Sequence, residues 1–284
     1  MPTSTQRFDM KKIINNRSMF IGIIILSSLL FIAIFSGFFA PHEPDNTNLD
    51  KRLEPASREY PLGTDHMGRC ILSRILFGTR VTLFIGLSVV LSSLTIGLVV
   101  GTLSGYYGGI PDEIIMRIVD GFLAFPSMFL ALAIAGIFDG GISSLIFALV
   151  LVEWTSYARV ARSSVLSIKK MEFIEAAKGL GGNDTYVIVK HVIPNILSPL
   201  IVIATLGMGY VILASAGLSF LGLGVQSYPD WGLMINEGRE FIQRAPYIML
   251  FPGIAIMITV MGFNFLGDGI RDKLDPRGRD YEYP

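Results

Sequence analysis

Six long apolar stretches, separated by polar segments, dominate the hydrophobic pattern of the chain. They lie roughly at residues 19–40, 82–103, 117–137, 142–160, 196–221 and 247–267. A helix needs about 20 apolar residues to cross the hydrocarbon layer of a membrane. In lipid, every backbone N–H and C=O group must also find a partner within the protein, which favours helices. The pattern therefore predicts an all-α integral membrane protein with six transmembrane helices.

The first stretch follows the basic residues Lys11, Lys12 and Arg17, an order of charges that signal peptides also have. A cleaved signal peptide has an apolar core of about 7–15 residues. The core here runs from Met19 to Ala40 and is longer. We therefore expect an uncleaved membrane anchor.

The polar segments divide the chain into one membrane domain with short appendages. We expect a cytoplasmic N-terminus at 1–18, then the first transmembrane helix with an external segment at 19–81. A core transmembrane domain follows at 82–268 and contains a cytoplasmic loop at 162–194. A cytoplasmic tail is expected at 269–284.

The distribution of basic residues predicts the orientation, because cytoplasmic loops carry an excess of Lys and Arg. With both termini in the cytoplasm, fifteen of the 23 Lys and Arg residues lie on the cytoplasmic side and eight outside. Six of the eight lie in the external segment before residue 82, which weakens the asymmetry without reversing it. We expect both termini to be cytoplasmic.

Composition agrees with a membrane protein and excludes some other classes. The chain is 51% hydrophobic and 16% charged, whereas soluble domains carry about 25% charged residues. The formal net charge is zero, so nothing points to a nucleic-acid partner. Cys70 is the only cysteine, so an intrachain disulfide is impossible.

The loop at 162–194 is predicted to contain two short helices joined by a glycine turn. Apolar residues at roughly helical spacing precede Gly181 and Gly182. These glycines can take the left-handed conformation that ends a helix, and Asn183 or Asp184 can cap the next one. An exposed helical hairpin tied to two membrane helices is suited to transmitting force from a cytoplasmic partner.

The same loop resembles a known motif. The run Glu175-Ala176-Ala177, then Gly181, then His191-Val192-Ile193-Pro194, resembles the EAA loop of binding-protein-dependent ABC importer permeases. In that family the loop docks into a groove of the ATP-binding subunit. The resemblance implies the same role for Glu175, Ala176, Ala177, Gly181 and Pro194.

Three further blocks extend the resemblance over roughly 60–276. They lie at 62–80, at 219–234 and at 264–276. Together with the loop they are similar to the dipeptide/oligopeptide/nickel branch of the family, as the C-type member of a permease pair. The family usually has Asp where this chain has Cys70. The resemblance implies the type I ABC importer permease architecture.

The resemblance also implies partners and a location. A second homologous permease subunit would complete the pore, two cytoplasmic subunits would bind ATP and Mg, and an external protein would deliver the substrate. The location would be the bacterial inner membrane. The chain has no Gly-x4-Gly-Lys-Ser/Thr motif, so we expect neither a cofactor nor a catalytic site of its own.

Glu153 is the candidate for the translocation path, because an ionisable residue inside a membrane span is a functional-site hypothesis by default. The alternative interpretation is an interhelical hydrogen bond, or a helix end beside Trp154. A rival function, an ion-coupled secondary transporter, would need more charge within the spans. An intramembrane enzyme would need paired catalytic residues there.

The substrate stays open between a nickel ion or metal chelate and a di- or oligopeptide. The tripeptide Met234-Ile235-Asn236 slightly favours nickel or a chelate. His42 and His66 lie far apart in the external segment and are interpreted as surface residues, so no metal site is predicted in this chain.

Overall fold

A computed structural model describes residues 16–138, 140–224 and 227–274. Most of the predicted cytoplasmic N-terminus lies outside these ranges, as do the end of the predicted tail and the last two residues of the block at 264–276. The described residues contain no β-strand, only an isolated bridge between Thr64 and Cys70.

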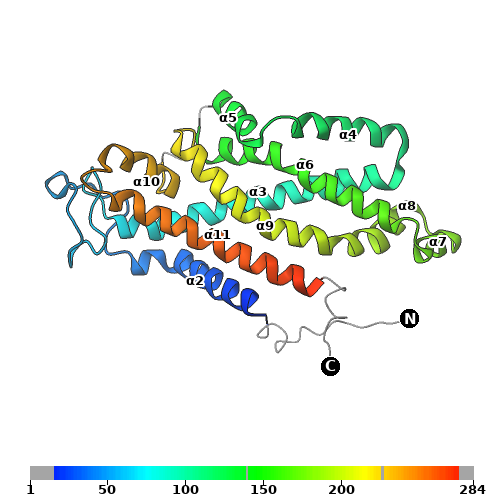
Figure 1. Cartoon of the computed structure of the whole chain (residues 1–284), viewed down its shortest axis with the longest axis horizontal. Helices are drawn as coiled ribbons and strands as arrows, with labels where there is room; N and C mark the ends of the chain where they lie inside the picture. The colour runs from blue at the N-terminus through cyan, green and yellow to red at the C-terminus, as the bar shows by residue number, and fades with distance from the viewer. Residues whose placement is uncertain (1–15, 139, 225–226, 275–284) are drawn as a thin grey trace.

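Long helices lie side by side along the molecule, and shorter elements close its two ends (Figure 1). In chain order the helices are α2 (Arg17–Phe39), α3 (Ile71–Tyr107), α4 (Gly109–Leu123), α5 (Ser127–Ile137), α6 (Ile142–Ile168), α7 (Glu172–Gly179), α8 (Asp184–Val187), α9 (Ile193–Phe220), α10 (Trp231–Gly238) and α11 (Tyr247–Leu274). A π-helical turn, Ile188–Val192, joins α8 to α9, and short 3-10 turns lie at Leu49–Lys51 and Arg239–Phe241.

The prediction that the third span is a single straight helix is wrong. Five described helical runs are long and apolar enough to cross a membrane, and α4 with α5 makes a sixth only as a pair bent by 90°. The bend lies at Pro126, between the two helices. Proline lacks an N–H and its ring collides with the preceding turn, and it also pushes the residue before it out of the helical region.

Two other boundaries differ from the predicted ones. The second short helix expected in the loop is instead the beginning of a continuous run, Asp184–Phe220, that includes the fifth span. Pro194 lies in the first turn of α9, within this continuous run. The preceding π turn accommodates it, because the N–H of Ile193 bonds to the carbonyl of Ile188. At the other end of the molecule, α3 begins at Ile71, within the segment expected to be an external loop.

The two ends of the helical bundle differ in structure. Residues 41–70 and α10 lie at one end, which we call the cap end, and α7 and α8 project from the other, which we call the hairpin end (Figure 1). Helix α4 lies along α6, α5 packs against α6 at an angle, and α2 lies along α11 on the opposite side. The arrangement places the predicted coupling loop and the predicted external segment at opposite ends.

Small residues allow the long helices to approach closely, as is common between membrane helices. Gly97, Gly101 and Gly105 of α3 face α6. A Cβ atom on Gly101 would lie 2.3 Å from the carbonyl oxygen of Ala158. Between α2 and α11, a Cβ atom on Gly22 would lie 2.6 Å from the backbone N of Leu266. These contacts exclude larger side chains and fix the registers of both helix pairs.

Candidate functional site

The predicted glycine turn at the hairpin end is present and well defined. Helix α7 ends at Gly179, and Gly181 has φ +87°, in the left-handed region. The N–H of Gly182 donates to the carbonyl of Ala177 at 3.0 Å, and that of Gly181 donates to Lys178 at 2.9 Å. These two bonds form a Schellman motif, which satisfies the last carbonyls of a helix.

The second arm of the hairpin starts with a side-chain cap. Asn183 accepts a hydrogen bond from the N–H of Tyr186 at 2.8 Å, which confirms one of the two predicted caps. Such caps satisfy one of the free N–H groups of a helix start. We refer to α7, the turn and α8 together as the hairpin.

A groove of about 630 Å³ lies on the hairpin. It is lined by Phe173, Ala176, Ala177, Leu180, Gly181, Gly182, Asn183, Tyr186 and His191. Leu180, which directly follows α7, is 90% exposed, whereas Ile174 of α7 is fully buried. The hairpin therefore presents a large apolar side chain to its surroundings while it anchors itself through another.

The structure brings together only part of the predicted coupling set. Ala176, Ala177 and Gly181 line the groove, and Glu175 is exposed on α7 without lining it. Pro194 is exposed on α9, beyond the groove.

Tyr106, at the end of α3, joins the hairpin to the bundle and was missed by the sequence analysis. Its hydroxyl donates to Asp184 Oδ1 at 2.7 Å, and Lys178 Nζ lies 4.6 Å from the centre of its ring. Lys169 Nζ also donates to the carbonyl of Gly105 at 3.0 Å. Both arms of the hairpin thus contact the end of one membrane helix. No local pattern marks a tyrosine for this role.

A partly buried ion pair lies near the base of the hairpin. Arg162 of α6 donates through Nε and Nη2 to the two carboxylate oxygens of Asp112, both at 2.6 Å. Ser104 of α3 donates to the same carboxylate. Bidentate arginine–carboxylate pairs are strong and directional, so α3, α4 and α6 are fixed to one another where the hairpin begins.

Glu153 lies near the middle of α6 and is half-buried. Its carboxylate makes no hydrogen bond or ion pair with another described residue. The alternative of a helix-end position beside Trp154 is wrong, because α6 continues to Ile168. Trp154 packs against Phe122 of α4 with ring centres 6.1 Å apart.

A network of two carboxylates and two guanidinium groups organises the cap end. Asp65 Oδ2 accepts from Arg69 Nε at 2.6 Å and from Arg74 Nη1 at 2.7 Å. Glu237 of α10 accepts from the same arginines at 2.8 and 2.6 Å. Burial would raise the pKa of Asp65, but Arg74 and Arg69 hold this pKa below its ordinary value of 3.8. The network thus ties three residues of the block at 62–80 to α10.

Asp65, His66 and Glu237 offer ligand atoms that lie within 4.8 Å of one another. Both carboxylates, however, are already neutralised by arginines, which would repel a bound cation. His66 stacks on Phe241 with ring centres 5.5 Å apart, and His42 stacks on Tyr60 at 4.6 Å. The histidines therefore pack against aromatic rings of the cap.

Cys70 has a packing role at the start of α3. It is buried and makes no side-chain hydrogen bond to the helix that it precedes. A capping bond that an aspartate at this position could form is therefore missing from this chain.

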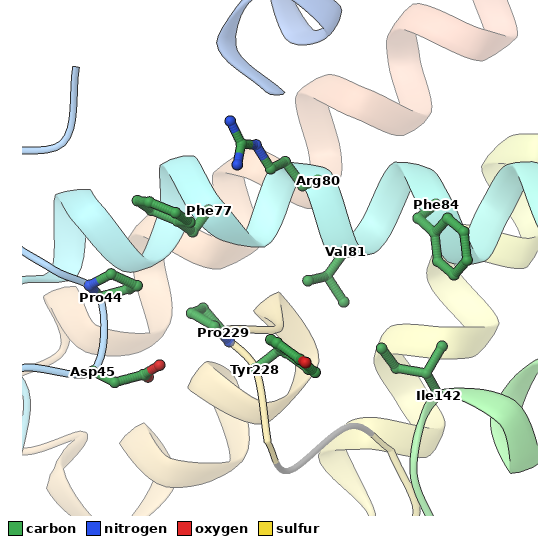
Figure 2. A pocket seen from close by; sticks show the side chains of 9 residues that line it. All are labelled: Pro44, Asp45, Phe77, Arg80, Val81, Phe84, Ile142, Tyr228 and Pro229. Carbon is green, nitrogen blue, oxygen red and sulfur yellow. The ribbon is translucent and has the colours of Figure 1, made fainter. Parts of the chain in front are cut away.

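A hollow of about 590 Å³ beside α3 at the cap end is mostly apolar (Figure 2). Arg80, which borders it, points away from the other lining residues in Figure 2. Its guanidinium donates to the carbonyls of Ala33 and Ile34, where α2 is kinked at Phe35. The arginine thus satisfies carbonyls beside the kink and holds α2 against α3.

The architecture defines a class, a multi-span helical membrane protein with a rigid hairpin at one end. Residues 97–280 match the family described as "Binding-protein-dependent transport system inner membrane component", and residues 6–56 match "N-terminal TM domain of oligopeptide transport permease C". The chain belongs to this family of permease subunits of ABC importers. It is a multi-pass protein of the inner membrane.

Relatives named for three different substrates match most of the chain. The dipeptide transport system permease protein DppC of Alkalihalophilus pseudofirmus is 43% identical over 94% of this chain and 88% of its own length. The glutathione permease GsiD of Pectobacterium atrosepticum is 40% identical over 90% and 85%. The nickel permease NikC of Escherichia coli K12 is 40% identical over 90% and 93%.

A solved structure shares the fold. A chain of the MetNI methionine ABC transporter in an inward-facing conformation matches with a TM-score of 0.60 at 21% identity. The match covers 71% of this chain and 97% of the other. The expected type I importer architecture is thereby confirmed.

The cap network leads to a prediction about stability. Replacing Asp65 by Asn should destabilise the protein at pH 7 by about 3–5 kcal/mol, because removal of one partner leaves buried charge uncompensated. The pKa of Asp65 is lowered in the folded state, so its contribution is complete above pH 3.8 and is lost only at lower pH. In thermal unfolding of the purified proteins, the difference in stability between the wild type and Asp65→Asn should therefore stay constant from pH 7 to pH 5.

The control is Glu54→Gln, which removes a partly exposed bridge to Lys51 in the same segment. Exposed bridges contribute little, so this variant should unfold close to the wild type. Equal destabilisation by the two substitutions would contradict the role given to Asp65.

Proposed function

We propose that the hairpin is the contact through which one of two cytoplasmic ATP-binding subunits acts on this permease. The observation that carries the proposal is a rigid, exposed hairpin whose two arms are both bonded to Tyr106 of α3. A force applied to the hairpin would therefore reach α3 directly, rather than being absorbed by a flexible loop. The ATP-binding subunits would hold ATP and Mg.

The exposed surface of the hairpin supports a protein partner. Leu180 is 90% exposed and Phe173 39%, beside a groove of about 630 Å³. Exposed apolar patches rimmed by polar residues commonly mark protein interfaces. The predicted coupling residues Ala176, Ala177 and Gly181 line the same groove.

We further propose that the chain forms half of a pore for a small hydrophilic solute. A second homologous permease would form the other half, and an external binding protein would deliver the solute. The solute is a di- or oligopeptide, or nickel or a metal chelate, since relatives of similar identity carry both kinds of name.

The tripeptide that favoured nickel has a packing role. Met234 is 1% exposed, and the side chain of Asn236 donates to the carbonyl of Phe220 at the end of α9. Met234 and Asn236 therefore serve packing, and they do not help to choose between a peptide and nickel as the solute.

The ion-coupled transporter is less well supported than the ATP-driven importer, because the chain belongs to a family of ABC importer permeases.

Gly181→Pro should abolish ATP-driven uptake by the reconstituted transporter while the chain still inserts. Gly181 needs φ +87°, whereas proline is restricted to φ near −65° and lacks the N–H that bonds to Lys178. Uptake into proteoliposomes, at equal amounts of assembled complex, is the measurement.

Gly179→Ala is the matched control. Gly179 is the last residue of α7, and a Cβ atom there would meet nothing within 4 Å. Wild-type uptake by Gly181→Pro, or an equal loss with Gly179→Ala, would remove the coupling role from the hairpin.

The charge distribution supports an orientation with both termini and the hairpin in the cytoplasm and the cap end outside. Single cysteines at Ser4, Ser227 and Tyr283, in a Cys70→Ser background, test it with a membrane-impermeant thiol reagent. Position 227 should react from outside and positions 4 and 283 only from the cytoplasmic side. Reaction of position 227 from the cytoplasmic side alone would reverse the orientation.

Glu153 is proposed to line the translocation path, because its carboxylate has no protein partner among the described residues. Glu153→Gln keeps the size of the side chain and removes its charge, so uptake should slow while assembly persists. Glu59→Gln, at an exposed position of the cap, should leave uptake unchanged. Equal uptake by the Glu153 variant and the wild type in vesicles would make Glu153 structural.

A further inference from the structure

Helix α10 packs closely against α3, α9 and α11 at the cap end. Trp231 is buried, and its Nε1 donates to the carbonyl of Ile75 of α3 at 3.1 Å. On the other side, a Cβ atom on Gly232 would lie 2.3 Å from the carbonyl oxygen of Ala216 of α9. The first turn of α10 therefore fixes this helix between α3 and α9.

Asp230 stands directly before this turn and is 2% exposed. Its side chain caps α10, because Oδ2 accepts a hydrogen bond from the N–H of Leu233 at 3.1 Å. The buried side chain of Ser219 of α9 faces the same carboxylate. The carboxylate is therefore enclosed where α9 meets α10, and the donors that face it from these two helices are neutral.

The charges around Asp230 do not balance it. Asp230 forms no ion pair with another described residue, and neither α9 nor the cap-end half of α11 contains a charged residue. The charged group that acts on Asp230 is Arg74 of α3. Arg74 is already bonded through Nη1 to Asp65 and Glu237. With Arg69, the cluster at the cap end holds three acids and two bases, which is an excess of one negative charge.

A carboxylate that is buried without a counter-charge is relieved either by a proton or by exposure to water. Asp230 lies outside the membrane-spanning helices. Burial raises its pKa above the ordinary value of 3.8, and the neutral donors and Arg74 offset this effect only in part. A proton on Asp230 therefore stabilises the packed position of α10, whereas ionisation destabilises it.

We propose that Asp230 is a proton-binding site that holds α10 against α9. With the proton bound, the carboxyl group is neutral and fits its enclosed position. Without the proton, the charge favours a state in which the first turn of α10 has moved away from α9 and water reaches the carboxylate. The proton would thus control how firmly the cap end is attached to α9, the helix that continues from the hairpin.

Thermal unfolding of the purified full chain tests the proton site. The folded state binds this proton more tightly than the unfolded state, so Asp230 adds stability as the pH falls through its folded-state pKa. Asp230→Asn keeps the helix cap but cannot titrate. As the pH falls from 8 to 5, the melting temperature of the wild type should rise relative to that of the variant by about 2–4 °C.

Two further variants control this measurement. Asp50→Asn removes an acid at an exposed position of the cap, and its difference from the wild type should not change with pH. Asp230→Ser also provides a cap and should behave as Asp230→Asn does. A difference between the wild type and both Asp230 variants that stays constant from pH 8 to pH 5 would overturn the proton site.

The movement of α10 is tested with a cysteine placed between the two helices. Ser219→Cys puts a thiol beside Asp230, and Ser227→Cys, at an exposed position, corrects for the effect of pH on the labelling reaction. Both are made with Cys70→Ser. The ratio of the labelling rate at position 219 to that at position 227 should rise between pH 5.5 and pH 8, by up to about tenfold per pH unit while Asp230 titrates.

With Asp230→Asn in the background, the same ratio should stay constant. A ratio that does not depend on pH, or that rises equally with Asp230→Asn, would overturn the movement of α10. Neither measurement uses ATP or a solute, so its outcome does not depend on the role proposed for the hairpin.

Discussion

The close approach of α3 to α6 is the constraint on which the rest of the structure depends. Helix α3 can lie against α6 because Gly97, Gly101 and Gly105 have no side chains, and even one Cβ atom on Gly101 would overlap the carbonyl of Ala158. Between helices in lipid, packing of this kind replaces the hydrophobic effect as the source of association. The contact sets the positions of Ser104 and Tyr106 along α3, and therefore those of the Arg162–Asp112 ion pair and of the hairpin.

Two groups of charges in this protein use the same residue types for opposite purposes. At the cap end, Asp65, Glu237 and two arginines are bonded to one another and largely buried, so their charges hold segments together. On α4 and α6, the pair of Asp120 and Arg159 is more than half exposed. An exposed pair contributes little to stability, whereas a buried pair cannot be broken without a large penalty.

The hairpin derives its rigidity from three independent devices. The Schellman motif at Gly181 closes the first arm, Asn183 caps the second, and Tyr106 bonds to both. The second arm then continues without a break into α9 through the π turn at Ile188–Val192. A displacement of the hairpin would consequently act on α3 and α9 together, which is the mechanical requirement for opening and closing a pore.

Sequence alone determined the membrane class, the number of apolar stretches, the glycine turn and the family, because each depends on local composition or on residues close together in the chain. It could not place Tyr106, Arg74 or Arg80, whose partners lie 46 to 163 residues away. Nor could it separate Glu153 and Arg159 from lipid-facing positions, since exposure depends on neighbouring helices. The bend at Pro126 was visible as a proline, but an apolar stretch of spanning length looks the same whether it crosses straight or turns by 90°. Only the packing of α4 on α6 decided that Arg159 pairs with Asp120 and that Glu153 has no hydrogen-bond partner among the described residues.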